Sequence, residues 1–169
     1  MQVNVIDSRL GRITAFDGPD IVVGEDTPLD AMVAKVLAKL GGGKLDALNL
    51  CSHAQPGAMQ FCKENLKFQT SYRLRALRGS FASANAGVYL HACSTAVRGE
   101  YKDGTLFCQQ LADDIGQPVY ASNACQKYTE SLAGLRIDFG DWEGELKCFL
   151  PGAGSDAVRF NAYRQLYDR

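Results

Sequence analysis

The sequence predicts a single α/β domain with a mostly parallel sheet and helices on both faces. Short apolar segments typical of buried strands alternate with segments whose apolar residues recur every three or four positions, as they do in helices. Alternation of strand and helix is the pattern of right-handed crossovers in a parallel sheet. The chain has 169 residues, 46% of them apolar, which suits one core rather than two. We therefore expect one domain over residues 1–169.

The first half of the chain opens with two short candidate strands, 3–6 and 21–23, which extend the sheet or form an edge hairpin. A helix is predicted over 28–40, because its apolar residues form one stripe. Thr27 is a candidate cap for this helix, and the glycines 41–43 end it. The remaining elements are strands over 45–51, 87–92 and 119–122, helices over 70–84 and 104–115, and an edge strand over 142–150 within a C-terminal extension, 140–169.

The charge balance argues against two classes of partner. Lys and Arg total 18 against 19 Asp and Glu, a net charge of −1, so the chain has no field of one sign to attract nucleic acid or an anionic membrane. No apolar run approaches the roughly 20 residues of a membrane span, and the first residues do not resemble a cleaved signal. We expect a cytoplasmic protein, with export by a route without a cleaved signal left open.

Six cysteines are present, and a chain with a good core does not need disulfide staples. We therefore expect mostly free thiols. Cys51, Cys62, Cys108 and Cys148 are expected to be structural, whereas Cys125 lies just past the predicted strand 119–122.

A histidine and a cysteine follow two of the predicted strands. Strand 45–51 is followed by Ser52-His53, and strand 87–92 by Cys93. If the two strands are parallel neighbours, their carboxyl ends bring an imidazole beside a thiol, at the edge where ligands bind in open α/β sheets. A neighbouring imidazole converts a thiol to the nucleophilic thiolate. We predict Cys93 as nucleophile and His53 as base, with His91 in a supporting role at most.

Other polar residues at the strand ends are candidates for contact with a substrate. Ser52 precedes the predicted base, Ser94 follows the predicted nucleophile, and Ser122 and Asn123 end the strand at 119–122. Polar residues are also ordinary at such positions, so a purely structural role stands beside this one.

These motifs resemble the caspase-like clan of cysteine peptidases, and most closely a caspase-like domain found in large bacterial surface proteins. The similarity covers residues 45–123, with Ser52-His53 and a Pro-Gly-Ala at 56–58, then the strand before Cys93 and a Val-x-Ala-Ser at 119–122. The resemblance implies a three-layer sandwich and hydrolysis of a peptide bond in a polypeptide substrate by the dyad of His53 and Cys93. It implies an oxyanion site made by the backbone N–H groups of Cys93 and Ala54. The clan usually has Gly where this chain has Ala54. The scheme requires no cofactor and no metal.

Two other functions remain open. The change to Ala54 is compatible with a catalytically inactive caspase-like module that binds a protein partner. Alternatively, His53, His91, Cys93 and Cys125 are of the types that bind zinc, although they lack the usual zinc-site spacing.

Overall fold

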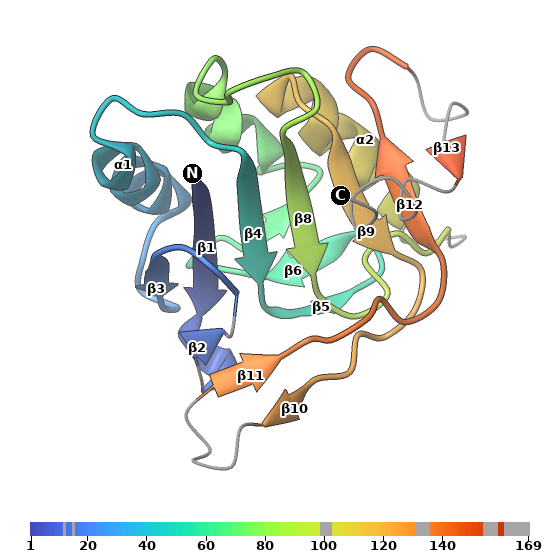
Figure 1. Cartoon of the computed structure of the whole chain (residues 1–169). Helices are drawn as coiled ribbons and strands as arrows, with labels where there is room; N and C mark the ends of the chain where they lie inside the picture. Colours follow the sequence, from blue (N-terminus) through green and yellow to red (C-terminus); the bar gives the residue numbers. More distant parts are fainter. Residues whose placement is uncertain (12, 15, 99–102, 131–135, 154–158, 161–169) are drawn as a thin grey trace.

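The computed structural model of the chain describes residues 1–11, 13–14, 16–98, 103–130, 136–153 and 159–160. Within these residues, a seven-stranded sheet has the order β13-β12-β9-β8-β4-β1-β3 (Figure 1). The strands from β3 to β9 in this order are parallel, whereas β12 is antiparallel to β9 and β13 to β12. The bounds are β1 Gln2–Asp7, β3 Asp20–Val23, β4 Ala47–Cys51, β8 Gly87–His91, β9 Val119–Ser122, β12 Leu146–Phe149 and β13 Arg159–Phe160. The predicted α/β class and mostly parallel sheet are confirmed.

The two α-helices lie where the apolar periodicity predicts them, with α1 at Leu29–Leu40 and α2 at Gly104–Ile115. Gly41 and Gly116 end them in the left-handed conformation that glycine adopts at low cost. The start of α1 differs from the prediction, because the Thr27 hydroxyl accepts from the N–H of Gly24 and caps no helix. The N–H of Leu29 donates instead to Glu64 Oε2 at 3.0 Å.

The segment predicted as a helix over 70–84 is a shorter 3-10 helix, η2, at Ser71–Leu77. Its buried residues Ser71, Leu74 and Leu77 are spaced by three, which matches the three residues per turn of this helix. The first two strands, β1 and β3, pair in parallel, so they extend the sheet and form no hairpin.

All the described α-helices lie on one face of the sheet, so the predicted helices on both faces, and with them the predicted three-layer sandwich, are absent from the described residues. Helices α1, η2 and α2 bury side chains in one core with alternate residues of β1, β4, β8 and β9, including Val3, Leu48 and Val88. The cause lies in the connection from β1 to β3. It runs across the sheet in the opposite direction to the others, and by the right-handed rule it occupies the opposite face. This connection contains only η1 (Ser8–Leu10) and β2 (Ile13–Thr14).

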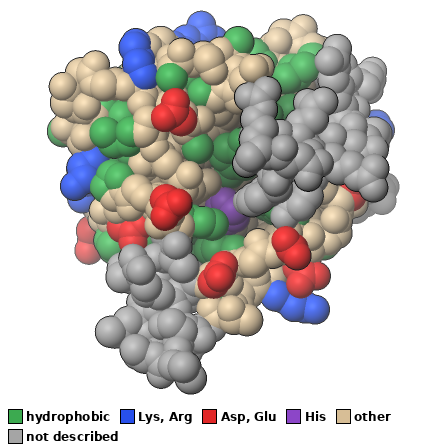
Figure 2. All heavy atoms as spheres, in the orientation of Figure 1, with side chains coloured by type: hydrophobic (Ala, Val, Ile, Leu, Met, Phe, Trp, Pro, Cys, Tyr) green, Lys and Arg blue, Asp and Glu red, His purple; other side chains and the backbone are tan. Residues whose placement is uncertain are grey.

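The opposite face is covered by small elements. Strands β10 (Thr129–Glu130) and β11 (Arg136–Asp138) form a second sheet with β2. Phe16 and Phe139 pack there over Ile6 and Cys51. Figure 2 shows this side of the molecule, and on its described part Lys and Arg are scattered among Asp and Glu without a continuous patch of one sign. No helix in the described residues is both long and apolar enough to cross a bilayer.

A third sheet lies at the carboxyl end of β4 (Figure 1). It comprises β5 (His53–Gln55), β6 (Ala58–Gln60) and β7 (Leu66–Lys67), all antiparallel. Met59 and Leu66 are completely buried in the core shared with the helices. This anchorage fixes the β5–β6 hairpin against the body of the domain.

Candidate active site

His53 and Cys93 follow neighbouring parallel strands at equivalent positions. The pairing of β4 with β8 ends with Cys51 opposite His91, and each predicted site residue stands two positions beyond that pair. The N–H of Ser52 donates to the carbonyl of His91 at 3.3 Å and continues the contact past the strands. The sheet therefore has the two parallel strands in the order and register that the sequence predicts.

The sulfur of Cys93 is bound to Cys125 in a disulfide. This corrects the expectation of free thiols for these two residues. Cys93 is partly exposed and Cys125 exposed, so the disulfide is accessible to a reductant in solution. The signal in the sequence was the position of Cys125 just past β9, the strand next to β8.

The other four cysteines form no disulfide and are buried, as expected. Burial raises the pKa of Cys51 well above its ordinary value, raises the pKa of Cys62 to about 12 and raises that of Cys108 further. A buried thiol with a raised pKa carries little thiolate at neutral pH. Among the described residues, Cys93 and Cys125 are therefore the cysteines with access to reagents.

The chain turns sharply after β8. Ser94 has φ of 52°, a conformation uncommon for a residue other than glycine. Its N–H donates to the carbonyl of Ala124 at 2.9 Å, and the N–H of Ala96 donates to that of Ser122 at 3.0 Å. Within the described residues the N–H of Cys93 has no hydrogen-bond acceptor. It is thus free to donate to another group.

Ala54 lies in extended strand β5 opposite Met59. Its φ is not positive, so alanine in place of the clan's glycine causes no backbone strain here. The hairpin closes through the two residues Pro56 and Gly57, with Gln55 opposite Ala58. Since hydrogen-bonded and non-bonded pairs alternate in antiparallel strands, and the pair beside a two-residue loop is bonded, Ala54 belongs to a non-bonded pair. Its N–H consequently faces away from β6.

His91 is buried on the face of the sheet that carries no α-helix among the described residues, where other side chains contact its ring. A ring nitrogen lies 3.2 Å from Asn49 Oδ1, and the ring stacks on Trp142 with centroids 4.6 Å apart. Burial lowers the pKa of His91 to about 3. The ring is neutral at physiological pH, and its described contacts are with Asn49 and aromatic rings. These contacts indicate a structural residue.

Three of the four polar residues predicted at the strand ends have side-chain hydrogen bonds within the protein. The hydroxyl of Ser52 donates to the carbonyl of His53 at 2.9 Å, and that of Ser122 donates to the carbonyl of Glu143. Asn123 Oδ1 accepts from the N–H of Glu145 at 2.9 Å. Ser122 and Asn123 therefore hold the segment at 143–145 against the end of β9. Ser94, partly exposed beside Cys93, has no such bond from its hydroxyl in the described residues.

The described residues contain no group of three or more His, Cys, Asp or Glu side chains arranged to hold a metal ion. Two of the four ligands of the metal alternative, Cys93 and Cys125, are joined to each other. His91 contacts Asn49. The metal alternative thus gains no support from the geometry.

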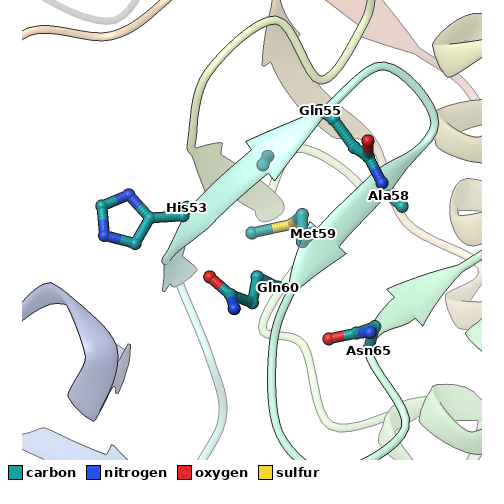
Figure 3. A pocket seen from close by; sticks show the side chains of 7 residues that line it. His53, Gln55, Ala58, Met59, Gln60 and Asn65 are labelled. Carbon is teal, nitrogen blue, oxygen red and sulfur yellow. The ribbon is translucent and has the colours of Figure 1, made fainter.

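A hollow of about 300 Å³ lies on the β5–β6 hairpin and begins at His53. It is lined by the residues of β5, those of β6, and Asn65. In Figure 3 the imidazole of His53 projects outward from the start of β5, and the Asn65 side chain points toward Gln60. Gln60 and Asn65 lie in no sequence motif and were not predicted. The turn residues Pro56-Gly57 are the sign of a hairpin that the sequence offers here.

These features define an α/β domain with a histidine and an accessible cysteine pair at the carboxyl edge of a parallel sheet. Residues 20–148, most of the chain, match the family model described as a domain of unknown function, DUF4347. The chain belongs to this family. No curated protein and no solved structure matches it.

Proposed function

We propose that the protein is a caspase-like cysteine peptidase that hydrolyses a peptide bond with Cys93 as nucleophile and His53 as base. The observation that carries the proposal is the in-register parallel pairing of β4 and β8, after which both residues follow at equivalent positions. Further support comes from the order of the parallel strands, β3-β1-β4-β8-β9. In open α/β sheets, ligands bind beyond the carboxyl ends of the strands, at the point where the direction of the connections reverses. In this sheet that point lies between β1 and β4. His53 follows β4 at that reversal.

The active form in this proposal is the reduced protein. A dithiol reductant supplies two electrons and two protons, the Cys93–Cys125 disulfide becomes two thiols, and the reductant is oxidised to its own disulfide. Cys93 then has a free thiol on a partly exposed loop.

The reaction proceeds through an acyl-enzyme. The Cys93 sulfur forms a bond to the carbonyl carbon of the substrate, and His53 takes the thiol proton. The oxyanion accepts hydrogen bonds from the backbone N–H of Cys93, which has no acceptor among the described residues, and from that of Ala54, which faces away from β6. The C–N bond breaks as His53 gives its proton to the leaving amine. Water then attacks the thioester, His53 accepts a proton from it and returns it to the thiolate, and the acid product leaves.

The alternative of an inactive binding module is favoured by one observation, the disulfide that occupies the Cys93 sulfur. The two functions differ in what reduction does. A peptidase gains a reactive thiol and hydrolytic activity, whereas a binding module gains a thiol no more reactive than an ordinary one.

The test measures site-resolved alkylation and peptide hydrolysis with the Cys125→Ser variant, in which Cys93 is free without a reductant. We expect Cys93 to react at pH 6 about ten-fold faster than in the double variant with His53→Ala, because the imidazole lowers the thiol pKa. We also expect Cys125→Ser to hydrolyse a peptide library without a reductant, whereas the parent requires one and Cys93→Ser is inactive. Equal alkylation rates with and without His53, together with no hydrolysis, would refute the peptidase and leave the inactive binding module as the proposal.

A further inference from the structure

Apart from the imidazole of His53, the side chains that line the hollow carry no ionisable group. None of its lining side chains is a carboxylate, an ammonium or a guanidinium. Its size, about 300 Å³, is at the lower end for ligand pockets and accommodates one large side chain. A charged group entering it would lose part of its hydration and would meet no carboxylate, ammonium or guanidinium among the lining side chains.

Two amide side chains in this hollow have no hydrogen-bond partner in the described part of the chain, those of Gln60 and Asn65. Each offers one carbonyl oxygen and two N–H donors. Asn65 is held in position through its backbone, which has φ of 57° and whose carbonyl accepts from the Thr70 hydroxyl at 2.7 Å. Gln60 and Asn65 adjoin the pair formed by Met59 and Leu66, and Met59 is completely buried and anchors the hairpin.

We propose that this hollow is a substrate subsite that selects an uncharged, hydrogen-bonding side chain, with glutamine as the best fit. The inference rests on the proposed peptidase function, since it concerns the polypeptide substrate of that site. An amide side chain both donates and accepts, so it complements Gln60 and Asn65 at once. The carboxylate of glutamate offers no donor to the amide oxygens, and lysine offers no acceptor to the amide N–H groups. Both charged residues also incur the cost of lost hydration.

Binding is tested without turnover in the Cys93→Ser, Cys125→Ser double variant. The probes are three capped pentapeptides, Ac-Ala-Ala-Xaa-Ala-Ala-NH2, in which Xaa is Gln, Glu or Lys. We expect the Gln peptide to shift the side-chain NH2 resonances of Gln60 and Asn65, with a Kd at least about ten-fold lower than those of the other two. Equal shifts with all three peptides, or none with any, would overturn the subsite.

A charge introduced into the hollow provides a second readout. Gln60 is exposed, so Gln60→Glu is expected to fold, and it should reverse the order in favour of the Lys peptide. The matched control is Gln69→Glu, an exposed position outside the hollow, which should keep the parent order. An unchanged order in Gln60→Glu would contradict the proposal.

Hydrolysis by Cys125→Ser distinguishes a failure of the subsite from a failure of the peptidase. Selective binding without hydrolysis of any peptide supports the subsite and refutes the peptidase. Hydrolysis with no preference for Gln over Glu and Lys supports the peptidase and refutes the subsite.

Discussion

The Cys93–Cys125 disulfide should contribute measurably to the stability of the domain, and its contribution can be calculated from the chain it encloses. The two cysteines are 32 residues apart in sequence. The loop-closure entropy for that separation corresponds to about 3–4 kcal/mol of unfolding free energy at 25 °C. For a domain of this size the same change lowers Tm by about 10 °C. We therefore expect Cys125→Ser to unfold at lower urea concentration than the oxidised parent.

The control is the reductant itself. Urea unfolding is followed by the fluorescence of the single Trp142, with and without dithiothreitol. Reductant should lower the midpoint of the parent to that of Cys125→Ser and should leave the variant unchanged. If the oxidised parent and the variant unfold at the same urea concentration, the disulfide does not restrict the unfolded chain and the reasoning is refuted.

Three further predictions concern stability. Burial lowers the pKa of His91 to about 3 from its ordinary 6.5, so between these values the unfolded chain binds a proton that the folded one does not. The unfolding free energy should therefore fall as pH drops, by about 1.4 kcal/mol per pH unit from His91 alone. When this free energy is measured by urea unfolding at pH values from 6 to 4, it should change less with pH in His91→Phe than in the parent. An equal change with pH in the two proteins would contradict this. In Gly104→Ala the new Cβ would lie 2.0 Å from the Thr95 carbonyl oxygen, so we expect the unfolding free energy to fall by about 1–3 kcal/mol, measured by thermal unfolding. A parent-like Tm would show that the backbone at Thr95 can move aside without cost. Asp103 caps α2 by accepting from two N–H groups of the first turn of the helix. In the same assay, Asp103→Ala should lower the unfolding free energy by about 1 kcal/mol, whereas Asp103→Asn should remain close to the parent in stability.

Much of the fold could be predicted because helix and strand patterns in this chain are local. Helix 104–115 and strand 119–122 have the predicted bounds, since a buried stripe, Gly116 and Pro118 all agree on where the helix ends. The placement of the helices was predicted wrongly, as covering both faces, although the pattern between the first two predicted strands was the place to see the difference. No helix is predicted between the first two strands, and that connection is the one that crosses the other face.

The site could be predicted only as far as strand pairing determines it. The neighbouring positions of His53 and Cys93 follow from parallel pairing, whereas the disulfide depends on how two loops fold back over the sheet edge. The position of Cys125 just past β9 brings it near Cys93, but sequence spacing does not determine whether the two sulfur atoms meet. Gln60 and Asn65 were missed for the same reason, because they approach each other only through the β5–β6–β7 sheet.

The unequal covering of the two sheet faces gives the domain two levels of stability. On one face of the sheet, α1, η2 and α2 share one large buried cluster, and none of these helices can leave the sheet without exposing that cluster to water. On the other face, one cluster in the described part of the chain has Ile6, Cys51 and Phe139 as its buried residues, with Leu10 and Phe16 packed against them. A few contacts hold that cover, so it can detach in a sub-global opening while the sheet and its helices remain folded. Amide hydrogens beneath the cover then exchange with solvent well before those of the helices, and His91 is reached by water in a molecule that is otherwise native.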